Sequence, residues 1–197
     1  MSKHQAWPQD VLAVGASGGE GLAGLRALLT ALPPGWPMPV LIELHRPSDR
    51  ESALAQVLSR ATSLPVRCAH GGEFLRPGVC YVGEPAGHLT LGPGGCAQLV
   101  DGADHVHRGS TIDMLFSSVA QNAGSRGVGL ILPGSLADGA RGLAKIAASG
   151  GRAYVIGVAG VPPAGMPHKA AELVDTATIV DSEDAFVREL AAALRQP

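Results

Sequence analysis

Residues 11–21, which read VLAVGASGGEG, decide the fold. The apolar run at 11–14 is typical of a buried strand, and the glycines after it indicate a sharp turn. From Leu22 to Leu32 the leucines recur at helical spacing, so a helix follows the turn. Ser17 therefore stands where a buried strand passes into a helix, below the free amides of the helix N-terminus. Because α/β proteins place a nucleophile or a phosphate at such a point, the stretch predicts a serine hydrolase.

The same alternation of strand and helix continues along the chain. Strands are predicted at 11–15, 40–44, 128–132, 153–156 and 178–180, and helices at 22–32, 49–61, 110–122, 139–148, 168–174 and 185–194. The helix at 110–122 opens with a capping-box-like pattern, Ser110 to Asp113. Because the strands are almost wholly apolar, we predict an α/β fold with a doubly wound, mostly parallel sheet and helices on both faces.

Between Pro65 and Val100 the period changes. Short apolar runs at 66–68, 79–82, 88–91 and 97–100 are separated by glycine and proline turns. This pattern predicts small, partly antiparallel strands without helices, as an insertion-like elaboration on the sheet.

Length and composition limit the class of protein. The 197 residues are 46% hydrophobic and 16% charged, which predicts one domain over 1–197 with a polar arm at 1–10. A formal net charge of −2 without any basic run argues against nucleic acid or an anionic membrane as the main partner. No apolar stretch has transmembrane length and the N-terminus is too polar for a signal peptide, so we expect a cytoplasmic protein without membrane insertion. Cys68, Cys80 and Cys96 lack C-x-x-C spacing and are expected to be buried free thiols.

Three polar residues follow predicted strands at their carboxyl ends, where parallel sheets collect functional groups: Ser17, His45 and Asp138. A serine hydroxyl needs an imidazole to take its proton, and a carboxylate holds that imidazole in the required tautomer. Each residue also has a plain structural alternative. Ser17 and Asp138 could be helix caps, and His45 could be a strand-end histidine with a satisfied hydrogen bond.

The motifs around these residues carry a resemblance to a known family. The G-x-S-x-G pattern at 15–19, LHRP at 44–47, HRGS at 107–110 with DMLF at 113–116, GSLADG at 134–139 and GMP at 165–167 resemble the catalytic domain of the chemotaxis methylesterase CheB, in the family's order and over about 11–180. The resemblance implies a Rossmann-like sheet and hydrolysis of glutamyl methyl esters on methyl-accepting chemotaxis receptors, with glutamine deamidation as a possible second reaction. It assigns Ser17, His45 and Asp138 to the family's triad and implies no cofactor and no metal.

Further roles come from the same comparison. The amide of Gly18 is a candidate for stabilising the oxyanion, and the amide of Ser135 falls where the family has a methionine implicated in that role. Arg46 and Arg108 are candidates to meet acidic segments of the receptor, and other chemosensory signalling proteins are possible partners.

The chain also departs from the family pattern. GSLADG at 134–139 stands where the family usually has GMGNDG, so Asp138 is kept while its neighbours differ. No receiver domain precedes the predicted catalytic domain, so we expect constitutive activity or control by a partner. These departures keep two alternatives open. One is a catalytically weak CheB-like module that binds within a signalling complex, and the other is a hydrolase for an ester outside the receptors.

Two further patterns compete with the esterase interpretation. Residues 19–24 fit G-x-G-x-x-G, and Glu43 lies where a ribose-binding acid would be expected, but the first glycine of this match already enters the helix. Close packing is therefore the favoured role for these glycines. His88, His105 and His107 could form a metal site, although surface histidines are the simpler expectation.

Overall fold

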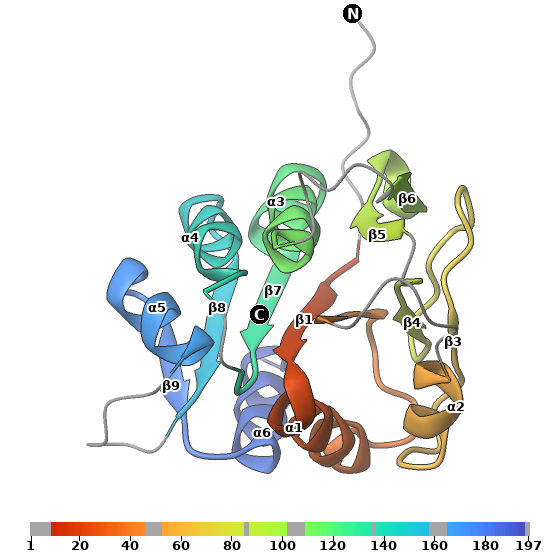
Figure 1. Cartoon of the computed structure of the whole chain (residues 1–197), viewed down its shortest axis with the longest axis horizontal. Coiled ribbons are helices and arrows are strands. Elements are labelled where there is room, and N and C mark those ends of the chain that lie inside the picture. Colours follow the sequence, from red (N-terminus) through yellow and green to blue (C-terminus); the bar gives the residue numbers. More distant parts are fainter. Residues whose placement is uncertain are drawn as a thin grey trace, which may run out of the picture.

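A computed structural model describes residues 9–45, 53–84, 87–101, 109–134, 137–157 and 165–195. One parallel sheet runs through it in the strand order β3-β4-β2-β1-β7-β8-β9 (Figure 1). Its strands are β1 (Val11–Ser17), β2 (Val40–His45), β3 (Val66–Cys68), β4 (Cys80–Val82), β7 (Gly127–Ile131), β8 (Arg152–Ile156) and β9 (Thr178–Val180). A separate antiparallel pair consists of β5 (Gly87–Leu91) and β6 (Ala97–Asp101). The predicted fold class is thereby confirmed.

Helices cover both faces of the sheet. One face carries α1 (Gly18–Ala31), α2 (Leu54–Ser59) and α6 (Glu183–Ala193), and the other carries α3 (Thr111–Ala123), α4 (Ala140–Ala148) and α5 (Met166–Leu173) (Figure 1). Short 3-10 turns occur at η1 (Pro93–Gly95) and η3 (Gly124–Arg126). Each face has its own aliphatic core, and β5 and β6 pack into the core beneath α3. None of the described helices is long and apolar enough to cross a membrane.

The strand order reverses beside β1. From β1 the chain adds β2 beside it and β3 at the edge of the sheet, inserts β4 between these two strands, and then returns to place β7 on the other side of β1. In open α/β sheets the crevice at such a reversal, beyond the carboxyl ends of the strands, is the usual binding site. Ser17 is the last residue of β1, and Pro133 and Gly134 follow β7, so both segments border this crevice.

Several boundaries differ from the sequence-based expectation. Helix α1 begins at Gly18 rather than Leu22, because its first turn is mostly glycine and adds no apolar periodicity. Strands β3 and β4 are not part of an insertion-like elaboration, since they extend the main sheet in parallel next to β2. The expected start of a helix at 49 lies outside the described residues.

Two of the three glycines of the G-x-G-x-x-G match, Gly21 and Gly24, serve packing, whereas Gly19 is exposed and a Cβ there would meet no neighbour within 4 Å. A Cβ at Gly21 would lie 3.0 Å from the Cβ of Ala16, and one at Gly24 would lie 3.0 Å from Oε1 of Glu183 on α6. The acid of the match, Glu43, is buried and accepts a hydrogen bond from the amide of Leu89 at 2.7 Å. Gly21, Gly24 and Glu43 are therefore occupied by contacts within the protein and are not available to a dinucleotide.

Candidate active site

The parallel register of β1 and β2 pairs Ser17 with His45. Side chains alternate along a strand, so Ser17 shares a face with Val11 and Ala13, which pack in the core beneath α3 and α4. His45 shares the same face with Leu41. Backbone pairing alone thus brings the hydroxyl and the imidazole to the same edge and the same face of the sheet.

The third residue reaches His45 from the loop after β7. The Nε2 atom of His45 lies 2.7 Å from Oδ2 of Asp138, and their side chains are only 11% and 1% exposed. With so little water to compete, the hydrogen bond fixes the ring in one orientation. An imidazole that donates its Nε2 proton to a carboxylate carries its lone pair on Nδ1, which leaves Nδ1 as the basic nitrogen.

The Asp138 carboxylate also caps helix α3. It accepts hydrogen bonds from the amides of Ile112 at 2.8 Å and Asp113 at 2.9 Å, which have no acceptor within the helix. The partial positive charge at the N-terminus of the helix lies next to this carboxylate, and the two attract each other. The alternative of a cap on the following helix is wrong, because the N-cap of α4 is Gly139. Asp138 therefore both caps a helix and binds His45. The helix that it caps is α3, which is distant in sequence, and not α4, which follows it directly.

Close packing brings α3 to this position. Ile112 lies over both Gly15 and Gly139, where an added Cβ would stand 2.3 Å and 2.6 Å from its Cγ2 atom. Gly139 also has a φ of 95°, a left-handed conformation that favours glycine. The two glycines therefore let the first turn of α3 descend onto β1 and onto the turn that carries Asp138.

Ser17 occupies the N-cap position of α1, but its side chain makes no capping hydrogen bond. Among the described residues the hydroxyl and the His45 ring are not hydrogen-bonded to each other, which is common before substrate closes a site. The residue is 5% exposed, because Gly134 lies directly beside it. A Cβ at Gly134 would stand 2.7 Å from the Cβ of Ser17 and 2.8 Å from Sδ of Met166. The hydroxyl is thus not committed to capping and sits in a narrow space.

Asp113 in α3 in turn caps the neighbouring helix α4. Its Oδ1 accepts from the amide of Gly142 at 2.7 Å and its Oδ2 accepts from Nε of Arg141 at 2.9 Å, both in the first turn of α4. The expected capping box within α3 is wrong, since Ser110 makes no side-chain cap and Asp113 turns away to α4. The reason is that Asp138 already supplies the acceptor that α3 needs.

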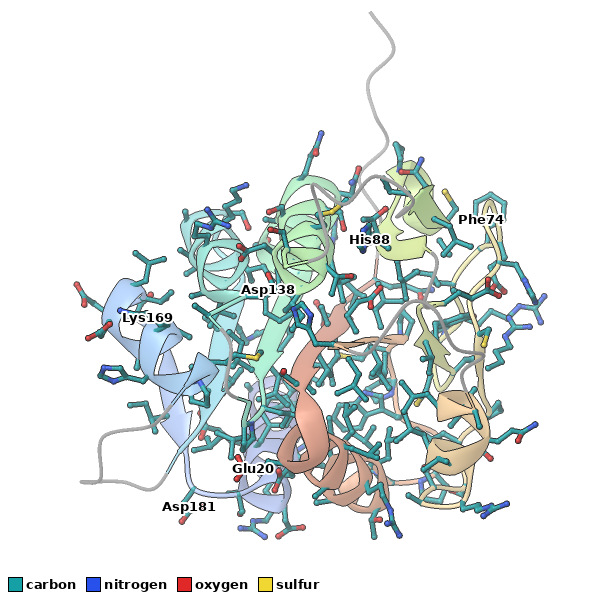
Figure 2. The ribbon with its side chains drawn as sticks, in the orientation of Figure 1. Glu20, Phe74, His88, Asp138, Lys169 and Asp181 are labelled. Atoms are coloured by element: carbon teal, nitrogen blue, oxygen red, sulfur yellow. The ribbon has the colours of Figure 1, made fainter. Side chains whose placement is uncertain are left out.

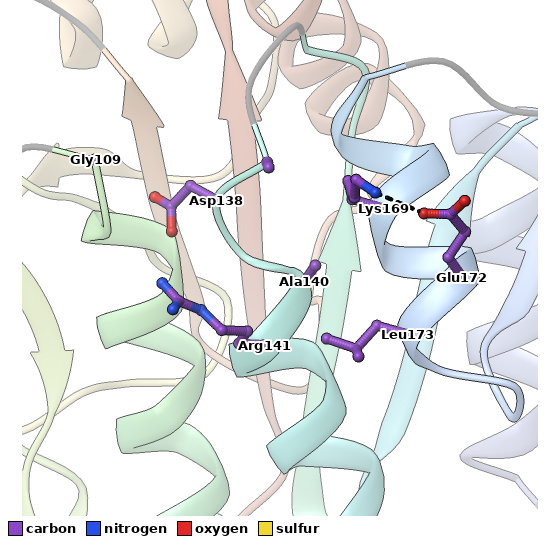
Figure 3. Close-up of a pocket in the computed structure, with 8 residues that line it drawn as sticks. Gly109, Asp138, Ala140, Arg141, Lys169, Glu172 and Leu173 are labelled. Carbon is purple, nitrogen blue, oxygen red and sulfur yellow. Dashed lines mark hydrogen bonds and ion pairs between the residues drawn. The ribbon is translucent and has the colours of Figure 1, made fainter.

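A pocket of about 450 Å³ opens beside Asp138, between the start of α4 and helix α5 (Figure 3). Its wall is apolar at Ala137, Ala140 and Leu173, and charged at Arg141, Lys169 and Glu172. The hydrogen bond from Lys169 lowers the pKa of the Glu172 carboxyl, and the nearby charge of His168 adds to this effect. Glu172 therefore stays ionised to lower pH than a free glutamate, and its negative charge lies beside the positive charge of Lys169.

The other candidate residues divide into two groups. Gly18 begins α1, where the first-turn amides lack acceptors within the helix. Ser135, Arg46, Arg108, His105 and His107 lie outside the described residues.

His88 is not the surface residue that was expected. It is 8% exposed, and its Nδ1 lies 2.8 Å from Oγ1 of Thr111. Asp138 and His88 thus flank the first turn of α3 (Figure 2). Within the described ranges, no group of three His, Cys, Asp or Glu side chains could hold a metal ion.

The cysteines are free, as expected, but only Cys80 is fully buried, and Cys68 and Cys96 are half-buried. Burial raises the pKa of the Cys80 thiol to about 12.

Sequence reasoning gives no role at the site to two of its neighbours, Asp113 and Gly134, although both lie in the motifs quoted above. Asp113 was assigned to its own helix, and only the non-local contact of α3 with α4 reveals its cap on Gly142. Gly134 follows a predicted strand at the sheet edge, and that position is the signal that could have found it.

Comparisons with known proteins identify the family of the chain. The family model described as CheB methylesterase matches residues 12–187. A protein-glutamate methylesterase/protein-glutamine glutaminase of Pectobacterium atrosepticum is 33% identical over 93% of this chain and 53% of its own length. A protein of the same name from Yersinia pestis bv. Antiqua is 35% identical over 93% of this chain and 53% of its own length.

A solved structure gives the same result. The crystal structure of the Thermotoga maritima CheB methylesterase catalytic domain matches with a TM-score of 0.82 and 25% identity, over 94% of this chain and 98% of that chain. The chain spans about half the length of the curated relatives named above. A family match across most of its residues and this structural likeness together show that the chain belongs to the CheB methylesterase family.

Proposed function

We propose that the chain is a serine esterase that hydrolyses glutamyl methyl esters on methyl-accepting chemotaxis receptors. Ser17 is the nucleophile, His45 the general base, and Asp138 the carboxylate that orients His45. The observation that carries the proposal is the buried 2.7 Å hydrogen bond between His45 and Asp138, next to a serine that is the register partner of His45. Membership of the family and the names of its relatives support the substrate class.

The reaction has two steps. In the first, Nδ1 of His45 takes the Ser17 proton while Oγ attacks the ester carbonyl, and methanol leaves with that proton. In the second, water attacks the acyl-serine, His45 takes a proton from it, and the proton returns to Oγ as glutamate is released. The net change is ester plus water to carboxylic acid plus methanol, and the acid then releases its proton to give the carboxylate. With a glutamine side chain ammonia leaves in place of methanol, which accounts for deamidation.

The negative charge on the carbonyl oxygen needs hydrogen-bond donors. The amide of Gly18 at the start of α1 is the donor we favour, because the helix dipole adds to its effect. We propose the amide of Ser135 as a second donor. Arg46 and Arg108 are proposed contacts for acidic receptor segments, and a cytoplasmic location would bring these segments and other signalling proteins within reach.

The decisive experiment measures methanol release from methylated cytoplasmic fragments of a chemoreceptor. Wild type is compared with Ser17→Ala and with Ser59→Ala, a control at an exposed serine on α2. We expect release by wild type and Ser59→Ala but not by Ser17→Ala.

Other outcomes would change the assignment. If wild type and Ser17→Ala both bind the fragment and neither releases methanol, the chain is a binding module. If neither variant acts on the fragment but a general ester probe labels wild type at Ser17, the substrate class is wrong.

A further inference from the structure

We infer that Asp113 is a positioning residue for the triad, and this inference rests on the proposed function. Asp138 and Asp113 cap each other's helices. The carboxylate of Asp138 accepts hydrogen bonds from the first turn of α3, which contains Asp113. The carboxylate of Asp113 accepts hydrogen bonds from the first turn of α4, which follows Asp138. Asp138 is bonded to α3, and α4 is bonded back to Asp113. The position of the carboxylate against His45 is therefore held by both helices.

The two caps are built on short contacts. The amide of Asp113 itself donates to Oδ1 of Asp138, so the two aspartates are linked directly through the backbone of α3. Gly142, which lies four residues after Asp138 along the chain, donates its amide hydrogen to Oδ1 of Asp113. A Cβ at Gly142 would lie 2.6 Å from the Cβ of Phe116, so α4 lies against α3 without a gap. Asp138 stands just before α4 and must move if the first turn of α4 moves.

Arg141 completes the arrangement from the solvent side. Its side chain is 74% exposed, whereas that of Asp113 is only 10% exposed. Figure 3 shows the Arg141 side chain extending from α4 towards the first turn of α3, below the carboxylate of Asp138. A cation in the first turn of a helix interacts unfavourably with the helix dipole. The ion pair with Asp113 offsets this unfavourable interaction for Arg141. The buried amide of Gly142 depends on the other oxygen of Asp113.

Asp113 makes no contact with the proposed nucleophile or its base. Its removal should therefore lower kcat by up to about 100-fold, the effect of a misplacement of about 1 Å at a catalytic group, and leave KM nearly unchanged. Asp113→Asn keeps a carbonyl oxygen for the amide of Gly142, while the exposed Arg141 can turn to water, so it should recover most of the activity.

The matched control is Lys145→Ala. Lys145 also links α4 to α3, through a 3.0 Å bond to the hydroxyl of Ser117, but it does so at the exposed surface. Loss of this bond should leave kcat unchanged. If Asp113→Ala does not fold, Asp113→Ser is used in its place. This variant also tests the cap, because the serine hydroxyl is one bond too short to accept the hydrogen bond from the amide of Gly142.

The test combines ester hydrolysis with proton NMR of the Nε2 proton that His45 shares with Asp138. That resonance is assigned by its loss in His45→Gln. We expect it to shift upfield or broaden in Asp113→Ala or Asp113→Ser, and to stay in place in Asp113→Asn and Lys145→Ala. A folded Asp113→Ala or Asp113→Ser with wild-type kcat and an unmoved resonance would overturn the inference.

The two proposals can fail separately. If wild type releases no methanol but the resonance still moves when Asp113 is truncated, the esterase proposal fails and the positioning role stands. If wild type is active and neither kcat nor the resonance responds to Asp113, the positioning role fails alone.

Discussion

Gly134→Ala tests whether the space beside Ser17 is required. The added Cβ would stand 2.7 Å from the Cβ of Ser17, 3.1 Å from its amide nitrogen and 2.8 Å from Sδ of Met166. Carbon atoms in good contact are about 3.5–4.0 Å apart, so the overlap with Ser17 is roughly 1 Å. Met166 has a flexible side chain and can give way, whereas the backbone of Ser17 is held by the pairing of β1 with β2 and β7, so the remaining overlap displaces the Ser17 side chain.

Two magnitudes follow from that overlap. Adding a methyl group to a filled site costs about 1–3 kcal/mol of unfolding free energy, which for a chain of this size lowers Tm by roughly 2–12 °C. A displacement of about 1 Å at the nucleophile can cost on the order of 100-fold in rate. We therefore expect the loss of kcat to be much larger than the loss of stability would explain.

Thermal unfolding and hydrolysis of an activated ester are measured on the same preparations. The control is Gly71→Ala, where an added Cβ has no neighbour within 4 Å and the effect should stay within about 0.5 kcal/mol. A Gly134→Ala variant with wild-type kcat and wild-type Tm would refute the argument. So would an equal loss in Gly71→Ala.

Three other perturbations separate structural from chemical roles. Ser182→Ala should cost about 1 kcal/mol in chemical denaturation, because its hydroxyl caps α6 through the amide of Ala185, whereas Ser17→Ala should leave stability unchanged, since its hydroxyl caps nothing. Phe186→Ala should cost about 3–5 kcal/mol in the same assay, because the ring is fully buried and packs edge-on against Tyr154 with centroids 5.0 Å apart. At pH 8 a thiol reagent should modify Cys68 and Cys96 in the native protein and Cys80 only after unfolding, since burial both excludes the reagent and raises the pKa of Cys80 to about 12. Modification of Cys80 at the same rate as the others in native protein would contradict this.

Local patterns were enough for the main elements of the fold. The predicted ends of β1, β2 and β7 lie within two residues of the observed ends. Strands that are buried on both faces consist almost entirely of apolar residues, so the apolar runs in the sequence mark their bounds. The direction of β3 and β4 could not be found in this way. Glycine and proline between short strands are equally compatible with a hairpin and with a longer connection, and only pairing with β2 makes these strands parallel.

The candidate site was predictable as a set of positions but not as a set of contacts. The rule that functional groups follow parallel strands selected Ser17, His45 and Asp138, and the structure places His45 beside both of the others. The caps could not be predicted. Asp138 and Ile112 are separated by 26 positions. Asp138 is next to α4 in the sequence, and no local pattern indicates that its carboxylate caps α3 instead.

The three proposed catalytic residues are held by two different kinds of structure. Ser17 and His45 are adjacent on a continuous backbone ladder, so a side-chain substitution that does not press on Ser17 directly can do little to separate them. Asp138 depends on the meeting of α3 with α4, which two carboxylates and the packing of Ile112 hold together. Changes between these helices should therefore act on the orientation of His45 and leave the nucleophile in place. Substitutions in the residues just before Asp138 should be tolerated for the same reason, since the hydrogen bonds from α3 fix the carboxylate from the far side.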